Sequence, residues 1–361
     1  MRILVVSHPP LAAELGAAQI AVNLAAALAA RGHDALAWSP EPLPRPAWAR
    51  WRGQTREIEA FVQRHGPFDV VDLPAITASA RLAAGARLVA RSVQPELRYL
   101  AMNLRAHLTR RQHQLPRTAV QTLLASAAVR QGWRRASSIL CLGSVERQWM
   151  QRHFPPLAPR LDAYVVAPAE ADRRAFAEVR GSRQPRPRGA GTRFLWIGRW
   201  AAHKGVHDLL RFIAERAGGG GGDTFTLAGC GGAPERTVPA RLLRDGRVRI
   251  VPSFRRDELP GLLAEHDAGL FTSLVEGWGL CLNEMLEAGL TVYATPAGGV
   301  QDLAPFWGAR LRPFPPPAAA AAAPAGGADP GPPPDLAGYL DHFSWPAIAA
   351  RYEAAVSRCF R

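Results

Sequence analysis

The feature that most constrains the fold is a regular alternation of short apolar runs and helical segments between Phe194 and Leu303. Runs this short and apolar are typical of strands that are buried on both faces of a sheet. Strands that alternate with helices predict a parallel, doubly wound α/β sheet. The clearest segments of this alternation are, in chain order, Phe194–Ile197, Val206–Ala217, Ala268–Thr272, Leu280–Ala288 and Thr291–Thr295.

The first half of the chain has the same character, and 361 residues are enough for two domains with separate cores. Its predicted strands are Arg2–Ser7, Ala35–Trp38, Phe68–Leu73, Ala86–Ala90, Ser138–Leu142 and Tyr164–Ala167. Its predicted helices are Ala17–Arg31, Ile76–Ala84, Leu97–Gln114 and Thr118–Arg134. We therefore expect a first Rossmann-like domain at 1–178, a Pro/Gly/Arg-rich linker at 179–192, a second Rossmann-like domain at 193–335 with a low-complexity insertion at 313–335, and C-terminal helices at 336–361.

A single lysine, Lys204, stands among 44 Lys and Arg residues. It follows the predicted strand Phe194–Ile197 in the loop that also contains Gly198, Arg199 and Gly205. Open α/β sheets bind ligands at the carboxyl ends of their strands, and two cations there suit a diphosphate. Taken alone, the pattern fits equally well an arginine-rich composition in which one surface lysine has survived.

Two carboxylates belong to the next part of the pattern. Glu276 lies in a loop with Gly277 and Gly279 after the strand Ala268–Thr272, and Glu284 lies on the following helix. Glycines allow a backbone to approach a ligand closely, and the amides at a helix N-terminus favour phosphate. A solvated helix residue would explain Glu284 and an ordinary turn would explain the glycines. Neither explains the carboxylates, the glycines and the Arg/Lys loop together.

These residues resemble the two signatures of the retaining glycosyltransferases of family 4, which have the GT-B fold. The first is Gly198-Arg199-x4-Lys204-Gly205 and the second is Glu276-x7-Glu284. The resemblance is specific from about Phe194 to Leu303 and weaker over nearly the whole chain. It implies two Rossmann-like doubly wound domains that face each other across a cleft, the first for the acceptor and the second for the nucleotide sugar, with a C-terminal helix that crosses back to the first domain.

The resemblance also implies a role for each matching residue. Arg199 and Lys204 would stabilise the leaving phosphate, Glu276 would bind the hydroxyls of the transferred sugar, and no metal or other cofactor would be needed. Glu284 would bind the ribose, and Val93 and Glu96 would lie on the acceptor or sugar side. The remaining residues expected to bind the donor are Gly16, Gly198, Gly229, Gly231, Gly277, Trp278, Gly279 and Leu280.

Two positions depart from the pattern of this family. Gly16 is followed by Ala17 where many relatives have a second glycine, and Val93 stands where many have a histidine beside the sugar. The imidazole contact to the sugar is lost with Val93, although a backbone carbonyl remains. We expect a transferase with altered sugar recognition, with a catalytically impaired GT-B protein as the alternative.

The formal net charge of +14 bears on the acceptor. Leu97 to Val145 contains no Asp or Glu, but it contains Tyr99, Trp133 and the arginines 98, 105, 110, 111, 117, 130, 134 and 135. A second basic and aromatic group consists of Arg45, Trp48, Arg50, Trp51, Arg52 and Arg56. Such surfaces suit a glycan or lipid-linked acceptor at an anionic membrane. An arginine-rich solvated helix face is an equally good interpretation.

Two further functions remain alternatives. The positive charge also suits nucleic acid, although no nucleic-acid-binding module is recognisable and we expect no specific nucleic-acid partner. A GT-B nucleotide-sugar epimerase would explain donor binding but not the paired cations and carboxylates.

The composition also bears on where the protein acts. The four cysteines are widely spaced, which predicts neither a disulfide framework nor a zinc site. Ile3 to Val6 is too short for the apolar part of a signal peptide, and no run approaches the roughly 18 apolar residues of a membrane span. We expect a cytoplasmic protein, and one of the two interpretations of its basic surfaces adds peripheral association with the inner face of the membrane.

Overall fold

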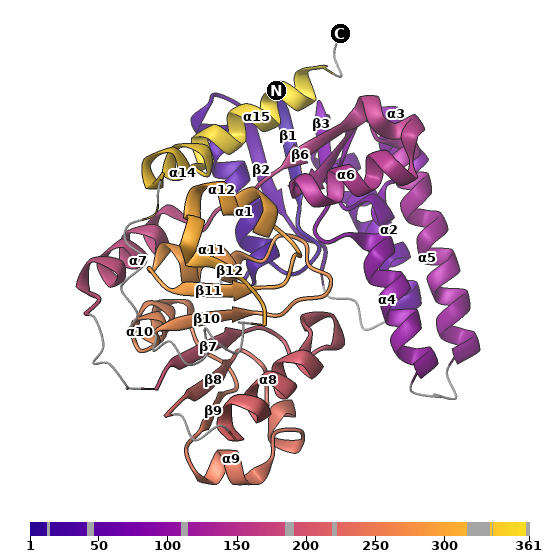
Figure 1. The fold of residues 1–361 in the computed structure, drawn as a ribbon. Helices are drawn as coiled ribbons and strands as arrows, with labels where there is room; N and C mark the ends of the chain where they lie inside the picture. The colour runs from indigo at the N-terminus through magenta and orange to yellow at the C-terminus, as the bar shows by residue number, and fades with distance from the viewer. Residues whose placement is uncertain are drawn as a thin grey trace. The chain divides into compact units, whose positions relative to one another are not determined.

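The computed structural model describes residues 1–12, 15–41, 47–109, 115–184, 191–218, 222–315, 333 and 335–358. The chain forms two compact units, one of Met1–Ala167 with Leu340–Arg361 and the other of Pro168–Tyr339 (Figure 1). Each unit contains one six-stranded parallel sheet. The predictions that involve Arg45, Arg110, Arg111, Cys359, the side chain of Trp48 and most of 313–335 lie outside the described residues.

The sheet of the first unit has the strand order β2-β1-β3-β4-β5-β6. Its strands are β1 Arg2–Val6, β2 Asp34–Trp38, β3 Val70–Leu73, β4 Arg87–Arg91, β5 Ser138–Leu142 and β6 Leu161–Tyr164. Its helices are α1 Gly16–Ala30, α2 Ala47–His65, α3 Ala80–Gly85, α4 Glu96–Thr109, α5 Leu115–Arg135 and α6 Gly143–His153. The order in which the strands follow one another across the sheet reverses between β1 and β3, which makes this unit doubly wound.

The C-terminal helix α15, Trp345–Ser357, belongs to the first unit and packs against α1 (Figure 1). The Ser344 hydroxyl begins this helix by accepting a hydrogen bond from the Ala347 amide at 3.2 Å. Ile348 and Val356 are fully buried on its inner face. The expected return of the C-terminal helix to the first domain is therefore confirmed.

The sheet of the second unit has the strand order β12-β11-β10-β7-β8-β9. Its strands are β7 Arg193–Ile197, β8 Thr224–Ala228, β9 Val248–Val251, β10 Ala268–Phe271, β11 Thr291–Ala294 and β12 Leu311–Pro313. Its helices are α7 Glu170–Ser182, α8 Val206–Gly218, α9 Ala240–Arg244, α10 Leu259–Ala264, α11 Leu280–Glu287 and α12 Val300–Trp307, and α14 Leu336–His342 joins the two units. The order of the strands reverses between β7 and β10, so the predicted doubly wound α/β architecture is confirmed in both units.

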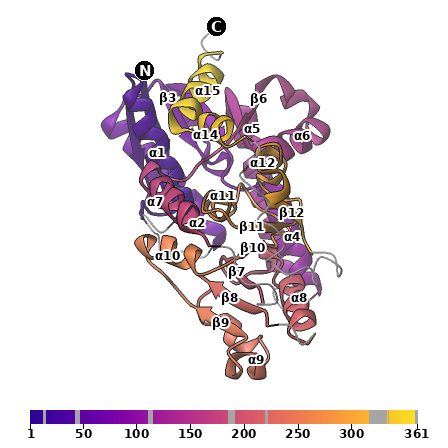
Figure 2. The same ribbon diagram turned by 60° about the vertical axis from the view of Figure 1, so that its left-hand side comes forward.

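The boundaries of the units differ from those predicted. Helix α7 packs against α10 and α11, as Figure 2 shows, and it therefore belongs to the second unit. Arg173 on this helix forms an ion pair with Glu287 on α11, with 3.0 Å between Nε and Oε2. The first boundary consequently lies after Ala167 rather than at 178, residues 179–182 of the predicted linker are helical, and the chain returns to the first unit after Tyr339 rather than at 335.

Two predicted elements of the first unit also differ, and helix α2 comes in addition to the predicted ones. Strand β6 pairs with β5 from Leu161 to Tyr164, so it ends where the predicted strand begins. The predicted helix Ile76–Ala84 is divided, because the Ser79 hydroxyl accepts a hydrogen bond from the Leu82 amide and starts a new helix there. Helix α2 was not predicted, because its Trp and Arg residues were interpreted only as a surface group.

Among the helices that the structure describes, none combines the length and the apolar character that are needed to cross a bilayer.

Candidate active site

The loops after β7 and β10 meet at the point where the order of the second sheet reverses. They are joined by one hydrogen bond from a side chain to the backbone and one between backbone groups. The Thr272 hydroxyl donates to the Lys204 carbonyl at 2.7 Å, and the Leu274 amide donates to the His203 carbonyl at 2.8 Å. The structure therefore brings the two predicted signature loops together at the usual position of a ligand in an open α/β sheet.

Gly205 makes this approach possible. Its φ angle is +66°, and a Cβ atom at this position would lie 1.8 Å from the carbonyl oxygen of Thr272. Only glycine fits such a conformation and such a contact without displacing the neighbouring backbone. The glycine after Lys204 is thus required for the contact between the two loops.

Lys204 and Glu276 form an ion pair at the centre of this site. Glu276 Oε2 also accepts a hydrogen bond from the Ser273 hydroxyl at 2.9 Å. Burial alone would raise the pKa of Glu276, but the Lys204 ammonium, aided by the Ser273 hydroxyl, holds this pKa below its ordinary value. Burial alone would lower the pKa of Lys204, but Glu276 reverses the sign and holds it above its ordinary value. Both groups are therefore charged at neutral pH.

Arg199 and His203 lie beside this pair. Arg199 is exposed, and its guanidinium forms no hydrogen bond or ion pair within the described ranges. Its positive charge opposes protonation of Lys204. Burial, followed by the charges of Lys204 and Arg199, lowers the pKa of His203 to about 4. His203 is consequently neutral at pH 7, and the free cation of this loop is Arg199.

The predicted glycines of this region occupy turns at strand ends. Gly198 follows β7, and its amide donates to the Ala228 carbonyl at 2.9 Å. Gly229 and Gly231 follow the neighbouring strand β8 and have φ angles of +69° and +64°. Gly277 is buried beside Glu276, and Gly279, with φ of +87°, directly precedes α11, whose first residue is Leu280. All of these backbone positions belong to the carboxyl end of the second sheet.

Trp278 is placed differently from a ligand-binding side chain. It is 2% exposed, and its indole nitrogen donates to Asn283 Oδ1 at 2.6 Å. Added Cβ atoms at Gly298 and Gly299 would lie 2.3 Å from the Trp278 carbonyl oxygen and 2.6 Å from its indole ring. The two glycines therefore make room for Trp278, and the Trp278 side chain holds the loop in place from the interior.

Glu284 is held by a cation that the sequence interpretation did not include. Arg256 Nη1 donates to Glu284 Oε1 at 2.6 Å, and Arg256 Nη2 donates to Asp172 Oδ2 at 2.8 Å. Burial raises the pKa of the Glu284 carboxyl, and Arg256 opposes that shift. Arg256 thus forms an ion pair with Glu284, the carboxylate that was expected to bind ribose. Its position in the charged run Arg255-Arg256-Asp257-Glu258 gave no signal that distinguished it from a surface residue.

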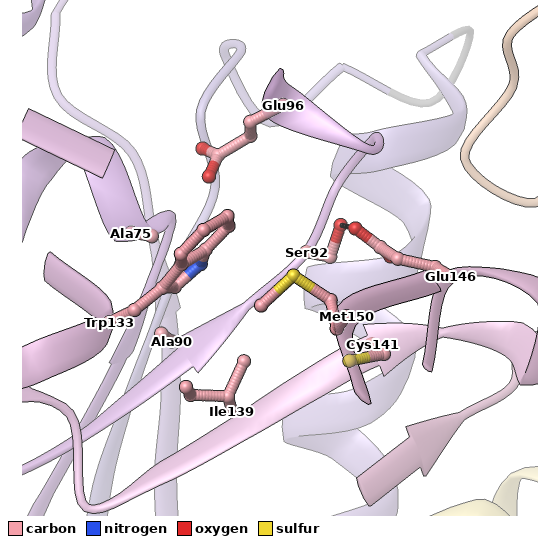
Figure 3. Close-up of a pocket in the computed structure, with 9 residues that line it drawn as sticks. All are labelled: Ala75, Ala90, Ser92, Glu96, Trp133, Ile139, Cys141, Glu146 and Met150. Atoms are coloured by element: carbon pink, nitrogen blue, oxygen red, sulfur yellow. Dashed lines mark hydrogen bonds between the residues drawn. The ribbon is translucent and has the colours of Figure 1, made fainter. Parts of the chain in front are cut away.

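Gly16, Val93 and Glu96 belong to the first unit. Gly16 is the first residue of α1, and Val93 is half-buried in the loop after β4. Glu96 points into a small pocket, as Figure 3 shows, together with Ser92, Glu146 and Trp133. Burial, followed by the charge of Glu146, raises the pKa of Glu96 to about 8, and burial raises the pKa of Glu146 to about 7. Glu146, which was not predicted, therefore shares a poorly solvated site with Glu96.

Comparison with known proteins agrees with this architecture. Residues 191–314 match the family model described as glycosyl transferases group 1. The chain is 27% identical over 205 residues to the alpha-D-kanosaminyltransferase of Streptomyces kanamyceticus, over 55% of this chain and 53% of that protein. It is 31% identical over 122 residues to the uncharacterized glycosyltransferase YqgM of Bacillus subtilis strain 168, over 33% of this chain and 34% of that protein. It therefore spans about half, or less, of the curated relatives it matches.

A solved structure extends the likeness to the whole chain. Alr3699/HepE of Anabaena, in complex with UDP and glucose, superposes with a TM-score of 0.60 and 15% identity over 99% of both chains. At this identity the likeness concerns the fold. The predicted GT-B architecture is thereby confirmed, whereas family 4 and retention stay predictions. This chain has the GT-B fold, and its residues 191–314 are similar to the glycosyl transferases group 1.

Proposed function

We propose that this chain is a retaining glycosyltransferase that moves a sugar from a nucleotide diphosphate sugar to a glycan or lipid-linked acceptor without a metal ion. The observation that carries the proposal is the ion pair of Lys204 with Glu276 at the point where the second sheet reverses its strand order. A cation that is held ready by a neighbouring carboxylate can turn toward a phosphate when one binds. The curated relatives, both named as glycosyltransferases, support the same reaction class.

The proposed reaction depends on departure of the nucleotide diphosphate. The bond between the anomeric carbon and the phosphate oxygen breaks while the acceptor oxygen bonds to the same face of the sugar. The acceptor proton passes to the departing phosphate. Lys204 and the exposed Arg199 stabilise the charge that grows on this phosphate, aided by the amides near Gly279 and Leu280. Glu276, released from Lys204, accepts hydrogen bonds from the sugar hydroxyls.

The donor site is tested by calorimetric titration of the full-length protein with UDP, GDP and ADP. We expect one nucleotide to bind with micromolar affinity, because the cations and the Glu284 carboxylate recognise the diphosphate and ribose that all three share, while the base decides among them. A folded protein that binds none of the three would overturn the proposal. Retention is tested separately, by the anomeric configuration of the product formed from the matching nucleotide sugar.

Arg256 is expected to act as a positioning residue for nucleotide binding. Replacing it with leucine removes the charge that opposes the raised pKa of Glu284. The pKa of Glu284 should then rise further, and a protonated carboxyl accepts hydroxyl hydrogen bonds less well than a carboxylate. We therefore expect the pH below which nucleotide affinity is lost to move upward, as measured by titrations across about pH 5 to 9.

Asp172→Asn is the matched control for this variant. It changes the other carboxylate that Arg256 contacts, but it leaves the guanidinium beside Glu284. Because the Asp172 charge itself raises the pKa of Glu284, the pH profile of Asp172→Asn should move downward if it moves, opposite to that of Arg256→Leu. Arg256→Lys should recover part of the lost affinity. An unchanged pH profile in Arg256→Leu would contradict the role assigned to Arg256.

A further inference from the structure

The two-helix arm of the first unit, formed by α4 and α5, carries apolar side chains on its surface. The two helices lie side by side (Figure 1). Leu108, Val120, Leu123 and Leu124 are 52%, 55%, 70% and 46% exposed. These are four of the ten large apolar side chains that are exposed among the described residues. A cluster of exposed apolar side chains of this kind marks a surface that binds a protein partner or a membrane.

Helix α5 has an apolar face on each of two opposite sides. Its inner face contains Ala125, Val129 and Trp133, which are buried at a spacing of four residues. Val120, Leu123 and Leu124 have the spacing i, i+3 and i+4 and therefore share the opposite face. The inner face packs into the core of the unit, so Val120, Leu123 and Leu124 form a second, exposed apolar face.

Arginines surround this outer face. Arg105 on α4 and Arg117, Arg130 and Arg134 on α5 are exposed. Within the described part of the chain, the guanidinium groups of Arg105, Arg117 and Arg134 form no ion pair. The sequence contains no Asp or Glu from Leu97 to Val145, so no acidic side chain of this segment neutralises them. The surface thus combines exposed leucines with uncompensated positive charge.

We propose that the outer face of α4 and α5 docks on a bilayer that contains anionic lipid. Leucines that enter the boundary between headgroups and acyl chains, beside arginines at the level of the phosphates, are the arrangement by which amphipathic helices bind such membranes. Duplex nucleic acid is a poorer match, since it is contacted mainly through its phosphates and leaves exposed leucines in water. This inference depends on the proposed function in one respect: if the chain is a transferase with a lipid-linked acceptor, that acceptor would lie at this surface.

The test is co-sedimentation of the full-length protein with vesicles of phosphatidylcholine, alone and with added phosphatidylglycerol. Binding is expected only with phosphatidylglycerol present. The double variant Val120→Gln/Leu123→Gln should lower the partition coefficient by at least about tenfold, because it removes two apolar side chains from the boundary. The control Val22→Gln/Leu36→Gln changes side chains of the same unit that are 45% and 44% exposed, and it should bind like the unmodified protein.

Charge is tested by Arg117→Gln, which should weaken binding about fivefold, against the exposed Arg241→Gln on α9, which should not. Three results would each overturn the proposal: equal binding to vesicles without phosphatidylglycerol, no binding to vesicles of either composition, or unchanged binding of the Val120→Gln/Leu123→Gln variant. Displacement from vesicles by duplex DNA at physiological salt would assign the face to nucleic acid instead. Nucleotide titration of the same preparations separates these outcomes from a failure of the transferase proposal.

Discussion

Lys204→Ala is expected to lower glycosyl transfer by about 100- to 1,000-fold, the usual effect of removing one group that stabilises charge in a transition state. The Lys204 ammonium is mostly buried and is held at the reversal point of the sheet by Glu276, so water cannot replace it as a preorganised partner of the leaving phosphate. Nucleotide binding should weaken as well, because the same cation contacts the diphosphate before transfer. Turnover of a nucleotide sugar and calorimetric titration measure the two effects.

The loss of activity has to be separated from a loss of stability. Without Lys204, the buried Glu276 carboxylate has no counter-ion, which costs up to about 3–5 kcal/mol when a buried pair is broken. The double variant Lys204→Ala/Glu276→Gln removes that uncompensated charge, so its free energy of unfolding should recover while its turnover stays low. Full turnover in Lys204→Ala would show that the phosphate is stabilised elsewhere.

The pair also makes stability depend on pH. Because Glu276 has a folded pKa below its ordinary value of 4.5, its contribution is present above that pH and is lost as the pH falls through the folded pKa. Lys204 limits stability at the alkaline end instead, because its folded pKa lies above its ordinary value of 10.5. Its contribution is complete below pH 10.5 and is lost as the pH rises through the folded pKa. Near neutral pH both contributions are complete, so a pH-dependent activity there would have to arise from other groups.

The sequence predicted the signature loops well because each is local. Gly198 to Gly205 joins β7 to α8, and Glu276 to Glu284 runs from the loop after β10 into α11. Parallel strands bring their carboxyl ends to the same edge of a sheet. What the pattern could not supply was the contact at Gly205, since the Thr272 carbonyl comes from a strand that is distant in sequence.

The residues that the sequence did not reveal act across long separations. Arg256 contacts Asp172, which is 84 positions away, and Glu284, which is 28 positions away. No local spacing relates three charged residues on three separate elements, and each alone resembles a solvated surface residue. Glu146 was missed for the same reason, because only the folded chain places it in the pocket with Glu96.

Gly205→Ala is expected to destabilise the second unit more than any other single methyl addition to the signature loops. Alanine at a φ of +66° costs about 1–2 kcal/mol wherever it occurs. At Gly205 the added Cβ also lies 1.8 Å from a backbone oxygen, which cannot rotate away as a side chain could. Forcing the loop after β10 aside should add about 1–3 kcal/mol. Nucleotide affinity should fall too, because the same displacement moves Glu276 from Lys204.

Gly246 supplies a matched control for this prediction. Its φ angle is also +66°, but an added Cβ there meets nothing within 4 Å. Gly246→Ala therefore measures the cost of the conformation alone, and the difference between the two variants measures the contact between the loops. Urea unfolding, followed by tryptophan fluorescence, should place Gly205→Ala clearly below Gly246→Ala, with nucleotide affinity reduced only in the former. Equal unfolding free energies would mean that the loops can separate at little cost, and the close contact at Thr272 would then be dispensable for holding Lys204 beside Glu276.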